Sequence, residues 1–594
     1  MGIANSRDIT TTGFDQDALS TTTLHDTITN SGRLSTSGDL ANGIFAYAGS
    51  VTIANSGAVT TSGAGAVGIF AIGDAARITN SGAVQTTGGY SESANLTADA
   101  IDIFGNDGRI DNSGALNTQG EFAAAIFISG DRGTIRNSGS ATSTGYGSLV
   151  LGVSGSATAI TNSGALKATD AGSFGIAAFG DSNSVTNSGS VTVQGAGGSG
   201  IAAFGDGNSL SNSGALSMTA GQYSVAMSAL GVSNTLANRG SIQLSGAAYG
   251  IGMFAGVGAH NVATNYGSIN VANAVSFAMG AAAPEGRGGT DLRLINLGQI
   301  SSSGEYSVGM VNGAPRFDVL PGAPDGDARA WAPTTDGLVV NNGSIRTAGN
   351  AAAGILTAGE NGHVVNTGRI ETWGGTANYS PMGPMSASGI IATGHDLIVG
   401  NARSGWIETH NASSPAVQLN VVDGIAPEIA GKSTFENLGS IKAVLVAIAG
   451  GASEETVINR GSIQGRVDLG AGDDTYVAAN NGRLNGVLFT GSGDDLVILQ
   501  NGSGKTVIGD FQAGPGIGDV LDVGEFHFTS FAQVLAASRQ SGSDVIVSLD
   551  SNDQLVLNNV FMNQLNADDF LLVSPATHAW ETPAFQQFHS DYMM

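Results

Sequence analysis

The sequence repeats a short motif with a period of 25 residues over most of its length. The motif reads Ile-Thr-Asn-Ser-Gly-Ala-Val and is centred on Asn-x-Gly, with a distorted copy at Asn401. Its Asn stands at Asn30, Asn55, Asn80, Asn112, Asn137, Asn162, Asn187, Asn212, Asn238, Asn265, Asn296, Asn341, Asn366, Asn437 and Asn459. A fixed period of this size indicates stacked units that bury a core between neighbours. The period therefore favours one elongated repeat domain.

Apolar residues hold fixed places in each repeat and identify its secondary structure. Aliphatic side chains recur two residues before the Asn, as at Ile28, and four residues after it, as at Leu34. A third column begins fourteen residues after the Asn, as at Ile44. Polar and apolar residues alternate between these columns, which is the periodicity of strands. Three short strands in 25 residues predict one coil, so we expect an all-β, elongated parallel β-helix.

The Asn-x-Gly motif has a structural explanation in such a coil. Gly can adopt positive φ at a corner, and Asn can hydrogen-bond to nearby backbone. In stacked coils the Asn side chains would lie roughly 4.8 Å apart, so their amides can bond to one another. We interpret the Asn residues as an inward structural ladder, and a row of Asn that binds a ligand is the alternative.

Composition and charge restrict the partners. The chain has 22 basic and 48 acidic residues and a formal charge of −26, so a nucleic-acid partner is disfavoured and divalent cations are plausible. It contains no Cys, which excludes disulfides and Cys-based zinc sites. No apolar run reaches the ~18 residues that span a bilayer, so we expect no membrane span. Residues Met1 to Asp8 lack the basic and apolar regions of a Sec signal peptide, and we expect none.

Beyond Asn459 two Gly-Asp turns replace the Asn motif. They run from Leu469 to Val477 and from Thr490 to Ile498, and both read G-x-G-D-D-x-hydrophobic. Such glycines let the backbone curl, and the carboxylate completes an oxygen cage suited to Ca²⁺. The turns resemble the hemolysin-type calcium-binding, or RTX, repeat. The resemblance implies Ca²⁺ as the ion and, as metal-site residues, Asp474, Asp495, Gly470, Gly472, Gly491 and Gly493.

The turns also depart from the RTX pattern. Leu469 and Thr490 replace the first Gly, and the copies lie 21 residues apart where the family has tandem nonapeptides. A third copy at Gly502 has Thr506 at the Asp position. We therefore expect one or two calcium ions. The turns crowd negative charge, so the C-terminal coils should loosen without Ca²⁺; the charged residues are Asp473, Asp474, Asp494 and Asp495.

The last part of the chain resembles the closing domain of RTX proteins. The resemblance rests on four segments, 507–511, 518–522, 543–549 and 565–571. In that family this domain caps the solenoid and precedes an uncleaved signal for type I secretion, which implies an extracellular protein exported by the type I machinery. The 25-residue repeats separately look like those of large bacterial surface β-helix proteins. We expect an N-terminal cap or assembly arm at 1–27, a β-helix at 28–465, RTX-like coils at 466–510, and a cap with secretion signal at 511–594.

The sequence does not predict an enzyme. Parallel β-helices that act on polysaccharides need clustered carboxylates on one face. The Asp column found in the repeats fits turn capping better than catalysis or metal binding, and it consists of Asp74, Asp131, Asp181 and Asp206. The eight His residues form no recognisable motif. The alternative is a polysaccharide-active or polysaccharide-binding β-helix whose groove is built by the insertions 301–337 and 372–390.

The third strand of each coil is apolar on both sides of the pleat, as in Ile44 to Tyr47 and Ile69 to Ile72. One side must face away from the core, so stacked strands form an apolar stripe that favours protein contacts, unless a loop or residues 1–27 cover it. We therefore expect a secreted, non-enzymatic structural protein that assembles with itself at the bacterial cell surface, stabilised by calcium. Filament, surface layer, matrix and adhesin are open alternatives, and cell-surface polysaccharide is a further partner.

Overall fold

The computed structural model describes residues 2–219, 221–246, 248–256, 258–284, 290–313, 331–332, 334–379, 383–421, 431–516, 518–575, 578 and 581–593. The chain divides into two compact units. Unit 1 comprises residues 1–280 with 319–325, and unit 2 comprises residues 281–318 with 326–594. Nearly all regular elements of the described residues in both units are β-strands.

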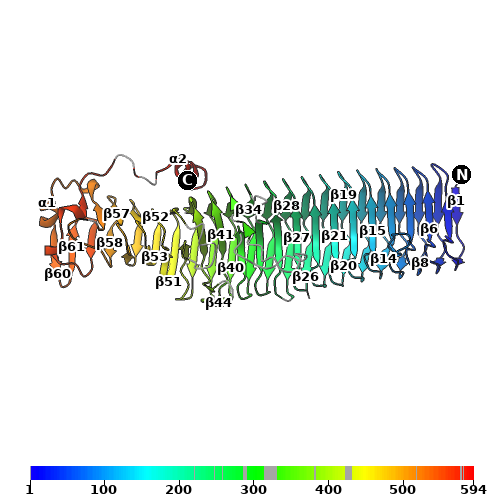
Figure 1. Ribbon diagram of the computed structural model, residues 1–594, viewed down its shortest axis with the longest axis horizontal. Helices are drawn as coiled ribbons and strands as arrows, with labels where there is room; N and C mark the ends of the chain where they lie inside the picture. Colours follow the sequence, from blue (N-terminus) through cyan, green and yellow to red (C-terminus); the bar gives the residue numbers. More distant parts are fainter. Residues whose placement is uncertain are drawn as a thin grey trace. The chain divides into compact units, whose positions relative to one another are not determined.

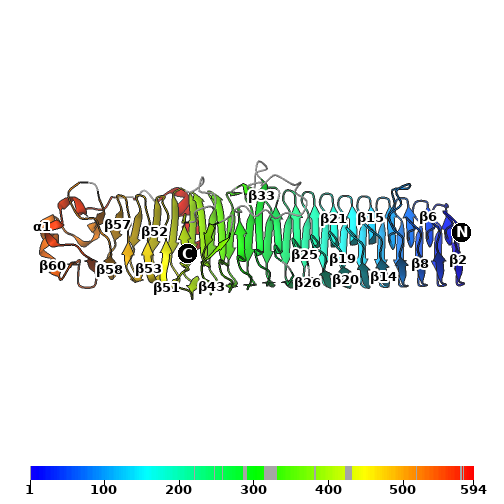
Figure 2. The same cartoon turned by 60° about the horizontal axis from the view of Figure 1, so that its bottom comes forward.

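Unit 1 is a parallel β-helix with three strands in each coil (Figures 1 and 2). The first strands are β1 (Gly2–Asn5), β4 (Thr27–Asn30), β7 (Thr52–Asn55), β10 (Arg77–Asn80), β13 (Arg109–Asn112), β16 (Thr134–Asn137), β19 (Ala159–Asn162), β22 (Ser184–Asn187), β25 (Ser209–Asn212), β28 (Thr235–Asn238) and β31 (Val262–Asn265). The second strands are β2 (Ile9–Thr11), β5 (Leu34–Thr36), β8 (Val59–Thr61), β11 (Val84–Thr86), β14 (Ala115–Thr118), β17 (Ser140–Ser143), β20 (Ala165–Ala168), β23 (Ser190–Val193), β26 (Ala215–Met218), β29 (Ser241–Leu244) and β32 (Ser268–Val271). The third strands are β3 (Leu19–Thr21), β6 (Ile44–Tyr47), β9 (Ile69–Ile72), β12 (Ile101–Phe104), β15 (Ala124–Ser129), β18 (Leu149–Ser154), β21 (Phe174–Phe179), β24 (Ser199–Phe204), β27 (Val225–Leu230) and β30 (Ile251–Gly256). The predicted fold class is confirmed.

Stacked aliphatic columns fill the interior of unit 1. Ile28, Leu34 and Ile44 come from the three strands of one coil, and all three are fully buried. The next coil places equivalent residues on them, because each strand pairs in parallel and in register with its successor. Burying one such side chain contributes about 1.5–3 kcal/mol. A single coil would leave both of its faces open, so the core exists only through stacking.

The repeated Asn forms an amide ladder inside unit 1. Nδ2 of Asn30 donates to Oδ1 of Asn55 at 2.8 Å, and Nδ2 of Asn55 donates to Oδ1 of Asn80 at 2.7 Å. The same Nδ2 of Asn30 also donates to the carbonyl of Gly32 at 3.0 Å. Both polar atoms of these buried amides therefore have partners, as buried polar groups require. The structural interpretation of the motif is confirmed.

The stacking begins earlier than the sequence predicts. Residues 1–27 are not a separate arm or cap, because β1, β2 and β3 already form a complete coil. They pair in register with β4, β5 and β6. Nδ2 of Asn5 donates to Oδ1 of Asn30 at 2.9 Å, so Asn5 belongs to the ladder. The motif is hard to recognise in the sequence because Arg7 stands where most other coils have Gly, as Arg403 does in the distorted copy at Asn401.

Unit 2 is also a parallel β-helix. Its first strands are β34 (Arg293–Asn296), β39 (Leu338–Asn341), β42 (His363–Asn366), β47 (Leu397–Asn401), β50 (Ser433–Asn437), β52 (Glu455–Asn459), β54 (Thr475–Ala478), β57 (Leu496–Leu499) and β59 (Val520–Asp522). Its second strands include β35 (Gln299–Ser302), β40 (Ser344–Thr347), β43 (Arg369–Thr372), β48 (Trp406–Thr409), β51 (Ser440–Ala449) and β53 (Ser462–Asp468). Its third strands include β36 (Val308–Asn312), β41 (Ile355–Glu360), β46 (Ile390–His395) and β49 (Val417–Leu419). The amide ladder runs from Asn341 to Asn459 with Nδ2–Oδ1 distances of 2.8 to 3.0 Å, and Asn401 takes its predicted place in it.

A small cap follows the coils of unit 2. In it β58 (Lys505–Ile508) pairs with β62 (Gln554–Leu557), which forms an antiparallel sheet with β60 (Ser538–Ser541) and β61 (Asp544–Ser548). Helix α1 (Phe531–Ala536) precedes β60. The final segment, α2 (Pro583–Phe588) and η5 (His589–Met593), leaves the cap and lies beside the coils of unit 2 (Figure 1). No helix in the described residues is long and apolar enough to cross a membrane.

Candidate functional site

The two Gly-Asp turns of unit 2 stack directly on each other. Gly470, Gly472, Gly491 and Gly493 have φ values between 100° and 141°, a region that favours glycine. A Cβ on Gly491 would lie 1.9 Å from the carbonyl oxygen of Gly470, and one on Gly493 would lie 2.0 Å from that of Gly472. The glycines therefore serve both the curl of each turn and the close approach of consecutive coils.

Asp474 and Asp495 immediately precede the paired strands β54 and β57 and are 1% exposed. Oδ1 of Asp474 accepts the backbone N–H of Glu455 at 2.7 Å, and Oδ1 of Asp495 accepts that of Asp474 at 2.8 Å. Asp519 takes the same position in the next coil, before β59. We call Glu455, Asp474, Asp495 and Asp519 the acidic ladder.

Burial makes the acidic ladder bind protons. It raises the pKa of Asp474 to about 7, and the charge of Asp495 adds to the shift. Burial raises the pKa of Asp495 to about 7 as well, and among the neighbouring charges Asp519 contributes most. Burial and the charge of Asp474 raise the pKa of Glu455 to about 8. The ladder is therefore partly protonated at neutral pH unless a cation compensates its charge.

Unit 1 contains a neutral counterpart at the same corner of the coil. Asn183, Asn208, Asn234 and Asn261 each precede a first strand, and we call them the neutral ladder. Their Oδ1 atoms accept the backbone N–H of the preceding coil, with N–O distances of 2.7 to 2.9 Å. This is the bond that Asp474 and Asp495 make in unit 2. In these coils either an amide oxygen or a carboxyl oxygen can therefore accept the same backbone N–H.

The acidic ladder fits the ion that the RTX resemblance implies. Oδ2 of Asp474, Oδ2 of Asp495 and Oδ1 of Asp519 are buried and have no hydrogen-bond partner among the described residues. Carboxylate oxygens are preferred ligands of Ca²⁺. No three acidic or His side chains of these turns, within the part of the chain that the structure describes, bring ligand atoms within 4.8 Å of one another. Backbone carbonyls would therefore have to complete a calcium site.

The third Gly-rich copy does not join this stack. Thr506, at the position where the repeat has Asp, lies on β58 opposite Leu555 of the cap. The backbone N–H of Gly502 donates to Oδ2 of Asp553 at 2.8 Å. The third copy is therefore built into the joint between the coils and the cap.

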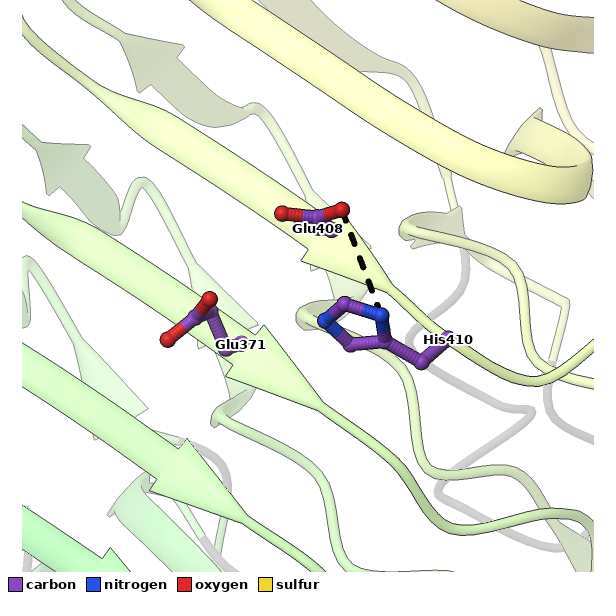
Figure 3. Close-up of side chains that lie close together, drawn as sticks. All are labelled: Glu371, Glu408 and His410. Carbon is purple, nitrogen blue, oxygen red and sulfur yellow. Dashed lines mark ion pairs between the residues drawn. The ribbon is translucent and has the colours of Figure 1, made fainter.

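A second acidic group lies on the second strands of unit 2. Glu371 on β43 and Glu408 on β48 are neighbours on paired strands. Together with His410 they bring one potential ligand atom each within 4.8 Å of one another (Figure 3). Arg346 and Lys442 take the equivalent positions on the strands at either side. We call the whole group the Glu371–Glu408 patch; it comprises Arg346, Arg369, Glu371, Trp373, Trp406, Glu408, His410 and Lys442.

Cations hold both carboxylates of the patch. Nε of Arg346 lies 3.0 Å from Oε2 of Glu371, which also pairs with Arg369. Nζ of Lys442 lies 2.7 Å from Oε1 of Glu408. Burial would raise the pKa of both carboxyl groups, but these partners outweigh burial and hold the pKa of each below its usual range. Both groups are therefore ionised at neutral pH.

Aromatic rings border the patch. Trp373 stacks on His410 with ring centroids 4.8 Å apart and an interplanar angle of 7°, and 41% of Trp373 is exposed. Nε1 of Trp406 donates to Oε2 of Glu408 at 3.1 Å, and the Arg369 guanidinium lies 5.4 Å from the centroid of the Trp406 ring. A flat exposed ring beside charged hydrogen-bonding groups suits a polar ligand such as a sugar.

The charges of the patch limit its chemistry. Two carboxylates at this spacing resemble the pair of a retaining glycosidase, but that reaction needs one of them protonated. Here the cations keep Glu371 and Glu408 ionised. A metal ion bound by these residues and His410 would have to displace the ion pairs with Arg346 and Lys442. The arrangement supports ligand binding better than proton transfer or metal coordination.

This patch was not predicted from the sequence. Glu371 and Glu408 lie far apart in the chain, and the segment between them breaks the 25-residue period. The available signal was a pair of matching segments, Arg369-Ile-Glu-Thr-Trp and Trp406-Ile-Glu-Thr-His. Aligning both on the core column at Ile370 and Ile407 would have placed the two Glu side by side. Of the insertions predicted to form a groove, 314–330, 333 and 380–382 lie outside the described residues.

The Asp column of unit 1 has the structural role that the sequence indicated. Oδ1 of Asp74 accepts the backbone N–H of Asn106 at 2.8 Å, and Oδ1 of Asp131 accepts that of Ser156 at 2.8 Å. Asp181 and Asp206 make the same bond to the following coil at 2.8 and 2.7 Å. These exposed carboxylates hold successive corners together.

The apolar stripe predicted on the third strands is present and partly exposed in unit 1. Phe45 and Phe104 are half-buried, and Tyr47 is 60% exposed. Phe179 and Phe204 stack with ring centroids 5.1 Å apart at an angle of 7°. We call these five residues, which recur on the outer side of third strands, the aromatic stripe.

One family comparison gives a match. Residues 26–231 are similar to the family described as the BigA third pectate lyase-like domain. No curated protein matches the chain. The matched segment lies within unit 1 and agrees with its β-helix fold. The acidic ladder and the Glu371–Glu408 patch lie outside it.

Proposed function

We propose that this protein is a secreted, non-enzymatic structural component of the bacterial cell surface that assembles with copies of itself and is stabilised by Ca²⁺. The aromatic stripe of unit 1 carries this proposal, because it places aromatic side chains on the outer side of several third strands, from Phe45 to Phe104 and again at Phe179 and Phe204. Ser129 and Ser154 separate these two groups. Large exposed apolar stripes are typical of protein contacts. The likeness to a pectate lyase-like domain of BigA supports a surface or polysaccharide-related role.

Calcium has a specific place in this proposal. Above neutral pH the acidic ladder would carry buried negative charge, because its carboxyl groups lose their protons. Ca²⁺ binding would offset that charge through the buried oxygens of Asp474, Asp495 and Asp519 that have no hydrogen-bond partner in the described part of the chain. Calcium is scarce in the cytosol and abundant outside, so the C-terminal coils would tighten after export. Export by the type I machinery, as the RTX resemblance implies, is part of the proposal.

Electron microscopy of the purified chain, with Ca²⁺ added or chelated, tests assembly. We expect ordered polymers that dissolve on chelation. Replacing Phe179 and Phe204 by Ser should weaken them, whereas replacing the outward Thr161 and Thr186 by Ser should not. Monodisperse particles at high protein concentration in calcium would contradict self-assembly.

Polysaccharide binding at the Glu371–Glu408 patch is a second candidate function. The specific observation is the exposed ring of Trp373, stacked on His410 beside the half-exposed cations Arg369 and Lys442. Sugars offer apolar faces to such rings and hydroxyl groups to such donors. Because both carboxylates are ionised, we propose binding without turnover.

Affinity electrophoresis in gels containing acidic or neutral polysaccharides tests this second function. Trp373→Ala should abolish retardation by the recognised polysaccharide. Tyr266→Ala removes an exposed ring from unit 1 and is the matched control. Equal retardation of both variants would show that the patch is not the binding site. Release of shortened polysaccharide chains on incubation would show that the protein cleaves its ligand and would contradict binding without turnover.

A further inference from the structure

The C-terminal segment of residues 581–593 packs onto the outer face of the first strands of unit 2. Phe588 and Met593 are 1% exposed and belong to a cluster with residues of β42, β47, β52, β54 and β57. A Cβ on Gly400 would lie 2.4 Å from Sδ of Met593 and 2.8 Å from Cζ of Phe588. The strand surface at Gly400 is therefore shaped for this segment.

Docking of the segment brings His589 to a buried acid. Nδ1 of His589 lies 2.7 Å from Oε2 of Glu436, whose side chain is fully buried. Nε of Arg460 lies 2.9 Å from Oε1 of the same carboxylate. Glu436 thus fixes the imidazole and one guanidinium side by side, although they are distant in sequence.

A cavity of about 270 Å³ opens beside this pair. Its lining consists of Arg403, Leu438, Arg460, Asn480, Asn481 and His589. Arg403 makes no ion pair or hydrogen bond in the described part of the chain, so its charge is available. Glu436 balances only one of the two guanidinium groups. In a protein with a formal charge of −26, the cavity is a local site of positive charge.

We propose that this cavity binds a small hydroxylated carboxylate, such as the uronic acid unit of an acidic polysaccharide. The planar guanidinium groups of Arg403 and Arg460 suit a planar carboxylate. The amides of Asn480 and Asn481 can bond to hydroxyl groups, and Leu438 offers an apolar surface. The volume lies just below that of pockets for drug-sized ligands, which fits one sugar ring.

The C-terminal segment is part of this site, because it contributes His589 to the lining of the cavity. His589 reaches the cavity only through the docking of Phe588 and Met593, so an undocked segment leaves the site incomplete. This site is separate from the Glu371–Glu408 patch, and Trp373→Ala should leave it intact.

Isothermal titration of the full chain with galacturonate tests the site. We expect saturable binding of galacturonate and none of galactose. Arg403→Gln should weaken binding at least tenfold, whereas Arg33→Gln, an exposed arginine of unit 1, should not change it. Equal affinity for sulfate would overturn recognition of a carboxylate, and unchanged binding in Arg403→Gln would overturn the site.

Phe588→Ala tests the contribution of the C-terminal segment. Arg403 and Arg460 remain in this variant, yet galacturonate binding should fall at least fivefold because His589 is no longer held. Hydrogen exchange in β54 and β57 would verify that the coils stay folded. Unchanged affinity would reject the segment as part of the site.

Discussion

The neutral ladder of unit 1 and the acidic ladder of unit 2 occupy the same corner of the coil, and Asp474 and Asp495 make the same hydrogen bond as the amides of unit 1. Asn208 and Asp474 each precede a first strand and accept a backbone N–H of the preceding coil at 2.8 and 2.7 Å. The amides carry no charge at any pH. The carboxyl groups of Asp474 and Asp495 have raised pKa values, and one buried oxygen of each has no hydrogen-bond partner among the residues that the structure describes. With the same backbone geometry, we expect the stability of the neutral ladder to be independent of pH and cations. We expect the stability of the acidic ladder to depend on both.

A second difference lies on the outer face of the first strands. In unit 1 this face is polar, with exposed Thr161 and Thr186. In unit 2 the equivalent column is largely apolar, with Ile458 and Val477 buried beneath the C-terminal segment. Glu436 is a charged member of this column and pairs with Arg460 and His589. A face that is covered can be apolar, whereas a face in water is usually polar.

Placing carboxylates in the neutral ladder should have the largest effect on stability. Asn208→Asp with Asn234→Asp would bury two charges with no cation, at a cost of about 3–5 kcal/mol each near pH 8. Burial would raise the pKa of the new carboxyl groups, so they should be protonated near pH 5 and the backbone amides should again be protected from hydrogen exchange. Hydrogen exchange of unit 1 measures the effect. Gln243→Glu makes the same change at an outward position and should have little effect; equal protection of the double variant at both pH values would refute the argument.

Removing the charge from the acidic ladder should have the next largest effect. Folded-state pKa values of about 7 exceed the unfolded value of about 4, so without Ca²⁺ the stability of these coils should fall as pH rises from 4 to 8. A rise of about three pKa units corresponds to about 4 kcal/mol per group, and solvent screening reduces this by about half, so Asp474→Asn with Asp495→Asn should remove roughly 3–5 kcal/mol of that fall.

Hydrogen exchange of β54 and β57 across this pH range, in chelator, measures the slope. The control is Asp473→Asn with Asp494→Asn, which removes the same charge from exposed neighbours and should keep most of the slope. A wild-type chain with no slope would contradict the assigned protonation.

Truncating a side chain of the docked C-terminal segment tests the difference between the outer faces of the two units. Phe588→Ala should cost about 3 kcal/mol of segment docking, a usual value for a buried Phe. Limited proteolysis within residues 581–593 should accelerate, while unit 1 stays unchanged. Phe561→Ala, at a residue 51% exposed in the cap, is the matched control. Equal cleavage of both variants would contradict the docking.

Calcium itself should give the smallest effect. At pH 8 and a concentration one hundred times the dissociation constant, Ca²⁺ should stabilise β54 and β57 by about 2.7 kcal/mol. The neutral ladder of unit 1 should not respond, and Asp474→Asn with Asp495→Asn should lose the response. Calorimetry with and without chelator gives the same comparison for the whole chain. A shift that is equal in the wild type and the double variant would place the ion elsewhere.

The sequence alone determined the features that repeat. The core columns at Ile28, Leu34 and Ile44 and the amide ladder through Asn30 and Asn55 were predictable, because every contact in a stacked coil joins one position to the same position a period away. Spacing therefore identifies the neighbour. The Gly-Asp turns stack for the same reason.

Only the tertiary structure decided the contacts that break the period. Arg7 replaces the Gly of the motif, so the first coil is not recognisable in the sequence. An insertion separates Glu371 from Glu408 in the chain, although their strands are paired. The docking of Phe588 against Gly400 joins residues that share no repeat position. The acidic and neutral ladders occupy equivalent positions because of the strand register. The changed spacing after Asn459 conceals this register in the sequence. Such contacts arise from the shapes and charges of folded surfaces, and a periodic pattern carries no record of them.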